Sequence, residues 1–194
     1  MIERTPGRLF YVMGVSGVGK DSLLAFLRQT ADPARVAVAH RYITRPAEAG
    51  AENHIALSEA EFQARAEAGW FALHWRSHGF SYATGREIDT WLRSGINVVV
   101  NGSREHLPQA VESYPDLVPV LITAEPHLIA ARLAFRNRES ADEIAGRISR
   151  HVDLPTLPGS VIVIDNSGAL EVAGAALLEL TEQRADGAEL QSVK

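Results

Sequence analysis

Residues 8–22 read RLFYVMGVSGVGKDS, and this stretch decides the fold. It contains an apolar run, Leu9 to Met13, and then a glycine-rich loop that leads into the helical pattern LLAFLRQ. The spacing GxxxxGK between a strand and a helix brings backbone N–H groups together around phosphate oxygens, and the helix N-terminus adds positive potential. The alternative is an ordinary glycine-rich turn with a solvated lysine, but spacing and context together favour a phosphate-binding loop.

Within this loop, Lys20 is predicted to reach the β and γ phosphates of a nucleotide. Asp21 stands where Ser or Thr usually follows the lysine to hold magnesium. A carboxylate is a good ligand for a hard cation, so Asp21 is predicted to bind magnesium or to anchor one of its ligands. An acid that satisfies the helix dipole is the other interpretation of Asp21. The predicted nucleotide-binding residues are Gly14, Val15, Ser16, Gly17, Val18, Gly19, Lys20, Asp21 and Ser22.

Apolar runs bounded by turn residues alternate with helical patterns along the rest of the chain, which is typical of a parallel sheet covered by helices. The predicted fold is therefore α/β: a three-layer α/β/α P-loop NTPase. Besides 9–13, strands are expected at 36–39, 96–100, 118–123 and 161–165. Helices are expected at 20–29, 59–68 after a capping box at Ser58, 87–94, 105–113, 126–136, 141–151 after a second capping box, and 170–183.

We expect one domain over residues 1–194, with its core in 1–35 and 95–184. The segment 35–95 is too long and too polar for a plain crossover between strands, so it is predicted to be an acceptor-binding insertion. Residues 136–150 are predicted to form a lid. The tail 185–194 lacks apolar periodicity and is expected to be flexible.

The composition restricts the class of protein. The chain has 194 residues, a net charge of -5 and no basic run, which argues against nonspecific nucleic-acid binding. It has no cysteine, so disulfides and thiolate zinc sites are impossible. No apolar stretch is long enough for a membrane span or a secretory signal. A cytoplasmic protein without membrane or nucleic-acid partners is expected.

Four segments together resemble the guanylate kinase family over most of the chain: GVSGVGKDS, YITRP, GWFALHWRSHGFSYAT and RLAFRNRES. The resemblance implies that Arg132, Arg136 and Arg147 close over the transferring phosphoryl group and act with Lys20 as catalytic residues. Arg132 and Arg136 are four residues apart and share a helix face. A solvated basic face is the less favoured interpretation of these arginines when they are considered without the phosphate loop.

The acceptor-binding segment departs from that family. Leu73 stands where the family has an acid that reads the guanine edge, and Ser81 replaces a tyrosine that helps to hold the acceptor phosphate, although Tyr82 remains beside it. Asn101 and Ser103 replace two aspartates after the third core strand. Removing carboxylates lowers the repulsion of a more anionic acceptor.

The altered set, with GKDS, TRP followed by ENH, and VNGSR, resembles the ribose 1,5-bisphosphate phosphokinases of phosphonate catabolism. The resemblance implies ATP and Mg²⁺ as cofactors, a phosphorylated sugar as substrate and 5-phosphoribosyl 1-diphosphate as product. Arg76 and Arg104 are predicted to bind the second phosphate of the acceptor. The predicted substrate-binding residues are Thr44, Arg45, His54, His74, Arg76, His78, Tyr82, Ser103 and Arg104.

Two other functions are compatible with the same fold. A guanylate kinase would share the nucleotide site, and a noncatalytic guanylate-kinase-like module would share the overall architecture. The phosphate loop and the arginines argue for catalysis, while Leu73 argues against guanine recognition. The sequence leaves the oligomeric state open.

Overall fold

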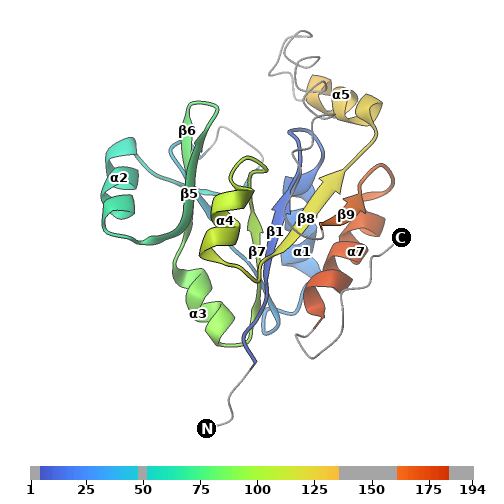
Figure 1. Cartoon of the computed structure of the whole chain (residues 1–194). Coiled ribbons are helices and arrows are strands. Elements are labelled where there is room, and N and C mark those ends of the chain that lie inside the picture. Colours follow the sequence, from blue (N-terminus) through green and yellow to red (C-terminus); the bar gives the residue numbers. More distant parts are fainter. Residues whose placement is uncertain (1–4, 48–51, 136–160, 184–194) are drawn as a thin grey trace.

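A computed structural model of the chain describes residues 5–47, 52–135 and 161–183. Its centre is a parallel five-stranded sheet with the strand order β2-β7-β1-β8-β9 (Figure 1). The central strand is fully buried. The bounds of the five strands are β1 Leu9–Met13, β2 Val36–Val38, β7 Asn97–Asn101, β8 Val118–Thr123 and β9 Ile162–Asp165.

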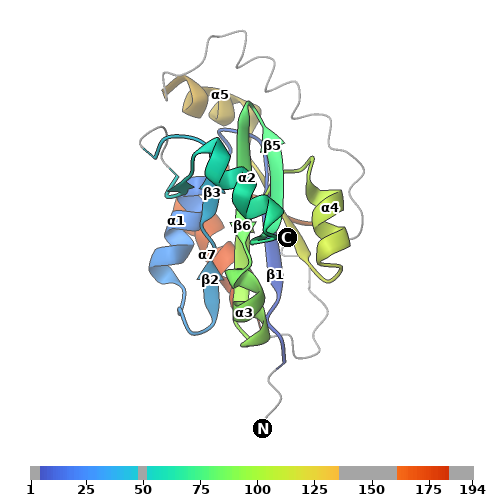
Figure 2. The same cartoon turned by 90° about the vertical axis from the view of Figure 1, so that its left-hand side faces the viewer.

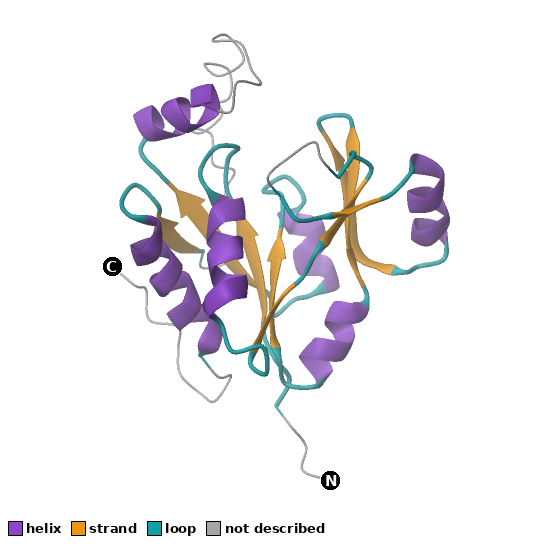
Figure 3. Cartoon of the chain, turned by 180° about the vertical axis from the view of Figure 1, so that it is seen from behind, coloured by secondary structure: helices purple, strands orange, loops and turns teal. Residues whose placement is uncertain are grey.

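Helices cover both faces of this sheet, as predicted for a three-layer α/β/α fold. On one face lie α1 (Lys20–Thr30) and α7 (Leu170–Glu182), which pack side by side (Figure 3). On the other lie α3 (Glu87–Arg93) and α4 (Leu107–Ser113). Because successive strand residues point to opposite faces, β1 supplies Phe10 to the first core layer and Tyr11 to the second.

A second, four-stranded sheet with the order β4-β3-β6-β5 stands beside the first (Figure 2). Its elements are β3 Arg41–Ile43, β4 Ile55–Ala56, α2 Glu59–Glu67, β5 Phe71–Ser77 and β6 Phe80–Gly85. We call this sheet and α2 the acceptor lobe. It lies within the predicted insertion 35–95, but β2, inside the same range, belongs to the central sheet.

The predicted helix starts and ends agree closely with the structure. Ser58 is the N-cap of α2, and its Oγ accepts a hydrogen bond from the Glu61 backbone N–H at 3.1 Å, as its capping box predicts. Helix α5 spans Pro126–Phe135. The expected helix 141–151, the lid 136–150 and the tail 185–194 lie outside the described residues. In the parts that are described, no helix has the length and apolar character that crossing a bilayer requires.

Candidate active site

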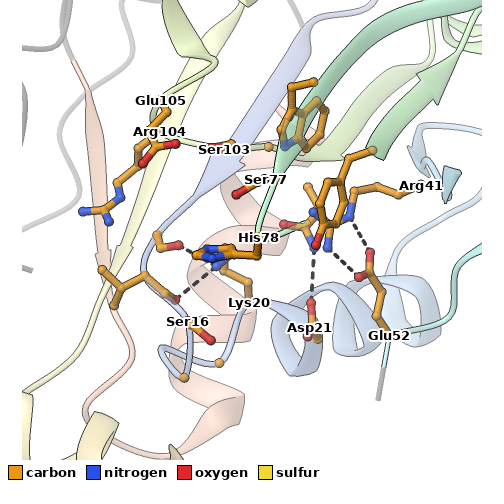
Figure 4. A pocket seen from close by; sticks show the side chains of 18 of the residues that line it. Ser16, Lys20, Asp21, Arg41, Glu52, Ser77, His78, Ser103, Arg104 and Glu105 are labelled. Atoms are coloured by element: carbon orange, nitrogen blue, oxygen red, sulfur yellow. Dashed lines mark hydrogen bonds and ion pairs between the residues drawn. The ribbon is translucent and has the colours of Figure 1, made fainter. Parts of the chain in front are cut away.

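A pocket of about 280 Å³ lies between the phosphate loop and the acceptor lobe (Figure 4). Parallel strands end at one edge of their sheet, so the loops after β1 and β7 both reach this pocket. Across from them lie the ends of β3 and the β5–β6 hairpin. Of the predicted residues, the structure places the following in the pocket lining: Gly14, Val15, Ser16, Gly17, Gly19, Lys20, Asp21, Arg45, His78, Tyr82, Ser103 and Arg104.

The phosphate loop is held in a conformation that requires glycine. Gly19 has φ +101°, and a Cβ at this position would come within 2.3 Å of the Asn166 side-chain nitrogen. Lys20, the next residue, points back along the loop and donates hydrogen bonds from Nζ to the carbonyl oxygens of Gly14 at 2.6 Å and Val15 at 3.1 Å. A phosphate would offer the same ammonium group stronger, charged acceptors.

Burial lowers the pKa of Lys20 to about 8. Asp21 opposes this shift, whereas the positive charges of Arg41 and Arg104 add to it. The ammonium group therefore loses its proton around pH 8 and not, as an exposed lysine does, above pH 10. An anion bound in the loop would favour the charged form and raise this pKa.

Asp21 and Asn101 form a pair of oxygen-bearing side chains at the end of β7. The Asn101 amide donates from Nδ2 to Asp21 Oδ1 at 3.2 Å. Asn101 is buried, and its Oδ1 has no hydrogen-bond partner among the described residues. This edge of the pocket therefore presents one carboxylate and one unpaired amide oxygen.

Two arginines of the acceptor lobe share one carboxylate. Arg41 donates to Glu52 through both Nε and one terminal nitrogen, whereas Arg45 contacts Glu52 Oε2 at 3.5 Å. Burial acts to raise the pKa of Glu52, but hydrogen bonds from Arg41 and the charges of both arginines outweigh it, so the pKa is lowered. Arg45 Nε is buried without a partner among the described residues. The Nε–H group of Arg45 therefore has no acceptor, whereas the Nε–H group of Arg41 already donates to Glu52.

The sequence analysis missed Arg41 and Glu52, which both line the pocket. Arg41 begins β3 and Glu52 precedes β4, and parallel pairing of these two short strands brings the residues together. The available signals were an arginine just before the YITRP segment and the first residue of the ENH segment, Glu52.

The β5–β6 hairpin separates its side chains between two faces. Trp75 and Ser77 line the pocket, so the alternate residues His74 and Arg76 project from the opposite face. There Arg76 donates to Glu59 of α2 at 3.0 Å. Strand alternation turns His74 and Arg76 away from the pocket, so neither lines it, and their predicted contacts with substrate stay a prediction.

Two more predicted substrate ligands are engaged elsewhere. The His54 ring is buried, with Nδ1 3.1 Å from the Glu52 carbonyl oxygen and Nε2 3.1 Å from that of Arg45. The Thr44 hydroxyl accepts a hydrogen bond from the Ser81 backbone N–H at 2.9 Å. Neither residue lines the pocket. In this structure both hold the Arg45 segment in place, and their predicted role as substrate ligands stays a prediction.

A stack of rings joins the acceptor lobe to the main domain. The Arg41 guanidinium lies 5.0 Å from the centre of the Tyr82 ring, which stacks on Trp75 at 5.6 Å. Trp75 in turn stacks at 5.2 Å on His106, just before α4. This stack fixes the position of Arg41 relative to the central sheet.

A second pocket, of about 450 Å³, opens on the other side of the phosphate loop. Arg132 lines it and donates to the carbonyl oxygens of Val18 at 3.1 Å and Asn166 at 2.9 Å. Asn166 also donates to Val18 at 2.8 Å, and its Oδ1 is buried without a partner among the described residues. Ser22 faces this pocket, and Val18 lines neither pocket. Arg136 and Arg147 lie outside the described residues.

Comparison with known proteins decides the family. No family model matches the chain. The ribose 1,5-bisphosphate phosphokinase PhnN of Burkholderia mallei (strain SAVP1) is 54% identical over 176 residues, which cover 90% of this chain and 95% of that protein. The chain belongs to the ribose 1,5-bisphosphate phosphokinase family. A second member, PhnN of Desulfomicrobium baculatum (strain DSM 4028 / VKM B-1378 / X), is 53% identical over 174 residues, covering 89% and 93% of the two chains.

This ribose 1,5-bisphosphate phosphokinase family member shares its fold with guanylate kinases. A crystal structure of guanylate kinase from Anaplasma phagocytophilum superimposes with a TM-score of 0.65 at 16% sequence identity, over 92% of this chain and 86% of that one. Leu73 is the residue that the sequence predicts to replace an acid that reads guanine. Its side chain is 3% exposed and packs in the core with Ile88. Its side chain offers no acceptor to a base.

The lowered pKa of Lys20 gives a testable protonation change. At pH 8, Lys20 should be protonated in about half of the protein molecules that have no bound ligand. A bound polyphosphate should bring Lys20 to full protonation. Binding of ATP at pH 8 should therefore take up about half a proton, measured by calorimetry in buffers of different ionisation enthalpy. Lys20→Arg keeps a permanent charge and should abolish the uptake. Proton release, or equal uptake in the arginine variant, would contradict this assignment.

Proposed function

We propose that the protein transfers the γ-phosphoryl group of ATP to ribose 1,5-bisphosphate, giving 5-phosphoribosyl 1-diphosphate and ADP. The observation that carries the proposal is one small pocket with the phosphate-loop Lys20 on one side and the arginines of the acceptor lobe on the other. Such a pocket suits a reaction between two phosphorylated molecules. Membership of the ribose 1,5-bisphosphate phosphokinase family gives the acceptor.

ATP would lie with its phosphates on the loop and its base in the second pocket. Asn166 lines this pocket, and its buried Oδ1 has no hydrogen-bond partner among the described residues, so Asn166 is proposed to accept a hydrogen bond from the amino group of adenine once the nucleotide is bound. Arg132 would stay close to the loop and stabilise charge on the transferring group. Arg136 and Arg147 remain predicted catalytic residues.

The acceptor would bind through its phosphates on the acceptor-lobe side. Each phosphomonoester carries a charge of about −1.5 to −2 at pH 7. Arg45, with its unused Nε, would hold one phosphate, and Arg104 after β7 would contribute a second cation. Arg41, already paired with Glu52, would act mainly by keeping the carboxylate neutralised.

The chemistry needs little help from a base. An oxygen of the 1-phosphate attacks the γ-phosphorus in line, a new P–O bond forms, and the bond to the β–γ bridging oxygen breaks to release ADP. The attacking oxygen is already anionic, so no proton has to be removed. Asn101 and Ser103 at the end of β7 fit this reaction because they add no negative charge next to the acceptor.

Magnesium is proposed to bind at the Asp21 edge of the pocket. The Asp21 carboxylate and the unpaired Asn101 Oδ1 are hard oxygen ligands, and Mg²⁺ commonly takes one or two protein ligands beside phosphates and waters. When bound, the ion neutralises phosphate charge. Asp21→Asn should raise the half-saturating Mg²⁺ concentration by about tenfold, the size of effect that the loss of one ion contact produces. An unchanged Mg²⁺ titration would exclude Asp21 as a ligand.

The acceptor can be tested directly by a side-by-side ADP-release assay with ribose 1,5-bisphosphate, GMP and other small phosphates. GMP would leave two guanine N–H donors unpaired near Leu73, at about 1–3 kcal/mol each, so it should be a worse acceptor by roughly two or more powers of ten. Equal efficiency with GMP would overturn the proposed acceptor. Tight binding of both ligands without turnover would instead indicate a noncatalytic module.

Two arginines of the acceptor lobe provide a matched pair of variants, because Arg45, after β3, lines the pocket and Arg76, on β5, does not. Arg45→Ala should raise the apparent KM for ribose 1,5-bisphosphate about tenfold or more, because a charge-assisted phosphate contact is lost. Arg76→Ala removes an equal charge from the face away from the pocket and should change this KM less than about twofold. Similar effects of both substitutions would mean that general charge, and not the Arg45 contact, holds the acceptor.

A further inference from the structure

The acceptor-lobe hairpin turns at His78 and Gly79. Ser77 pairs with Phe80, so the loop has only two residues, and both have positive φ, +49° at His78 and +78° at Gly79. Two consecutive left-handed residues form the type I′ hairpin turn, in which Asn-Gly, Asp-Gly and Gly-Gly are preferred. His78 is the only non-glycine residue with positive φ in the described part of the chain. The turn itself therefore does not call for a histidine.

The His78 side chain contributes nothing visible to the stability of the hairpin. It is exposed, and among the described residues no hydrogen bond, ion pair or ring contact involves it. His54 and His106 differ, because the first bridges two carbonyl groups and the second stacks on Trp75. Neither local conformation nor packing accounts for an imidazole at this turn.

The position of the ring suggests a different role. His78 lines the pocket together with Ser16, Lys20 and Asp21, and Figure 4 shows its ring extending from the hairpin toward the phosphate loop. The turn thus places the imidazole N–H of His78, a donor that belongs to the acceptor lobe, on the side of the pocket where the nucleotide phosphates would lie. It is a side chain of the acceptor lobe that approaches the proposed point of transfer.

We propose that His78 is a catalytic residue that donates a hydrogen bond from its imidazole to the attacking phosphate group of the acceptor. This role rests on the proposed function. The hydrogen bond orients the acceptor phosphate in line with the γ-phosphorus and offsets part of the repulsion between the two anions. The rigid two-residue turn holds the ring in place, and its left-handed conformation directs the ring into the pocket.

The proposal predicts that activity and stability separate at this position. His78→Asn and His78→Gly both suit a type I′ turn, so their melting temperatures should stay within about 2 °C of wild type or rise. Their kcat/KM for ribose 1,5-bisphosphate should fall about tenfold or more, which is typical for loss of a charge-assisted hydrogen bond. The Kd for ATP, measured without acceptor, should change less than about twofold. Arg76→Ala, on the opposite face of the same hairpin, is the control for a change in surface charge.

Each result decides the proposal. A kcat/KM within about twofold of wild type overturns it, and a large fall in melting temperature assigns His78 a structural role instead. Weaker ATP binding by the same factor as the loss of kcat/KM would place the contact on the nucleotide and also overturn it. Wild-type protein that does not use ribose 1,5-bisphosphate would sink the proposed function, whereas active wild type with equally active His78 variants would sink only the role of His78.

Discussion

Positive charges that are to meet phosphates repel one another before the phosphates arrive, and this constraint shapes the whole pocket. The effect is visible at Lys20, whose pKa is lowered first by burial and then by the charges of Arg41 and Arg104. Glu52 relieves part of the repulsion, because its partly buried carboxylate accepts hydrogen bonds from Arg41 and forms an ion pair with Arg45. Removing one partner of such a buried set leaves an uncompensated charge and destabilises the fold. Glu52 therefore supports the acceptor lobe in addition to its hydrophobic core of Phe62, Phe71 and Ala83.

The supporting residues around this cluster are consistent with the same constraint. His54 bonds to the backbone on both sides of the Arg45 to Glu52 segment, and the ring stack holds Arg41 over Tyr82. At the end of β7, Asn101 provides an amide where a carboxylate would have added negative charge beside the acceptor. The pocket thus keeps the phosphate-loop chemistry of its fold while changing what the acceptor side can recognise. Leu73, turned into the core, removes the means of reading a purine base.

The central sheet could be predicted from the sequence because its strands are buried apolar runs that alternate with helical patterns. The phosphate loop could be placed for the same reason, since local spacing alone defines it. The acceptor lobe was recognised only as an insertion. Its strands β3 and β4 have three and two residues, too few for a periodic pattern, and their pairing is set by the tertiary fold. This is why Arg41 and Glu52 were missed.

The position of His74 and Arg76 outside the pocket lining has a simpler explanation. In the run from Leu73 to Ser77, apolar and polar residues alternate, and this period already indicates that His74 and Arg76 face away from Trp75. The histidines and arginine were grouped by chemistry without regard to this alternation. His54 is different, since nothing in the local sequence shows that both of its ring nitrogens meet backbone carbonyl oxygens.

Phosphorus NMR of the product made from ATP and ribose 1,5-bisphosphate distinguishes phosphoryl transfer to a phosphate from transfer to a hydroxyl of the acceptor. For transfer to the 1-phosphate we expect the 1-phosphate signal to be replaced by two mutually coupled diphosphate signals, while the 5-phosphate remains a monoester. A third monoester signal, as expected for transfer to a ribose hydroxyl, would contradict it.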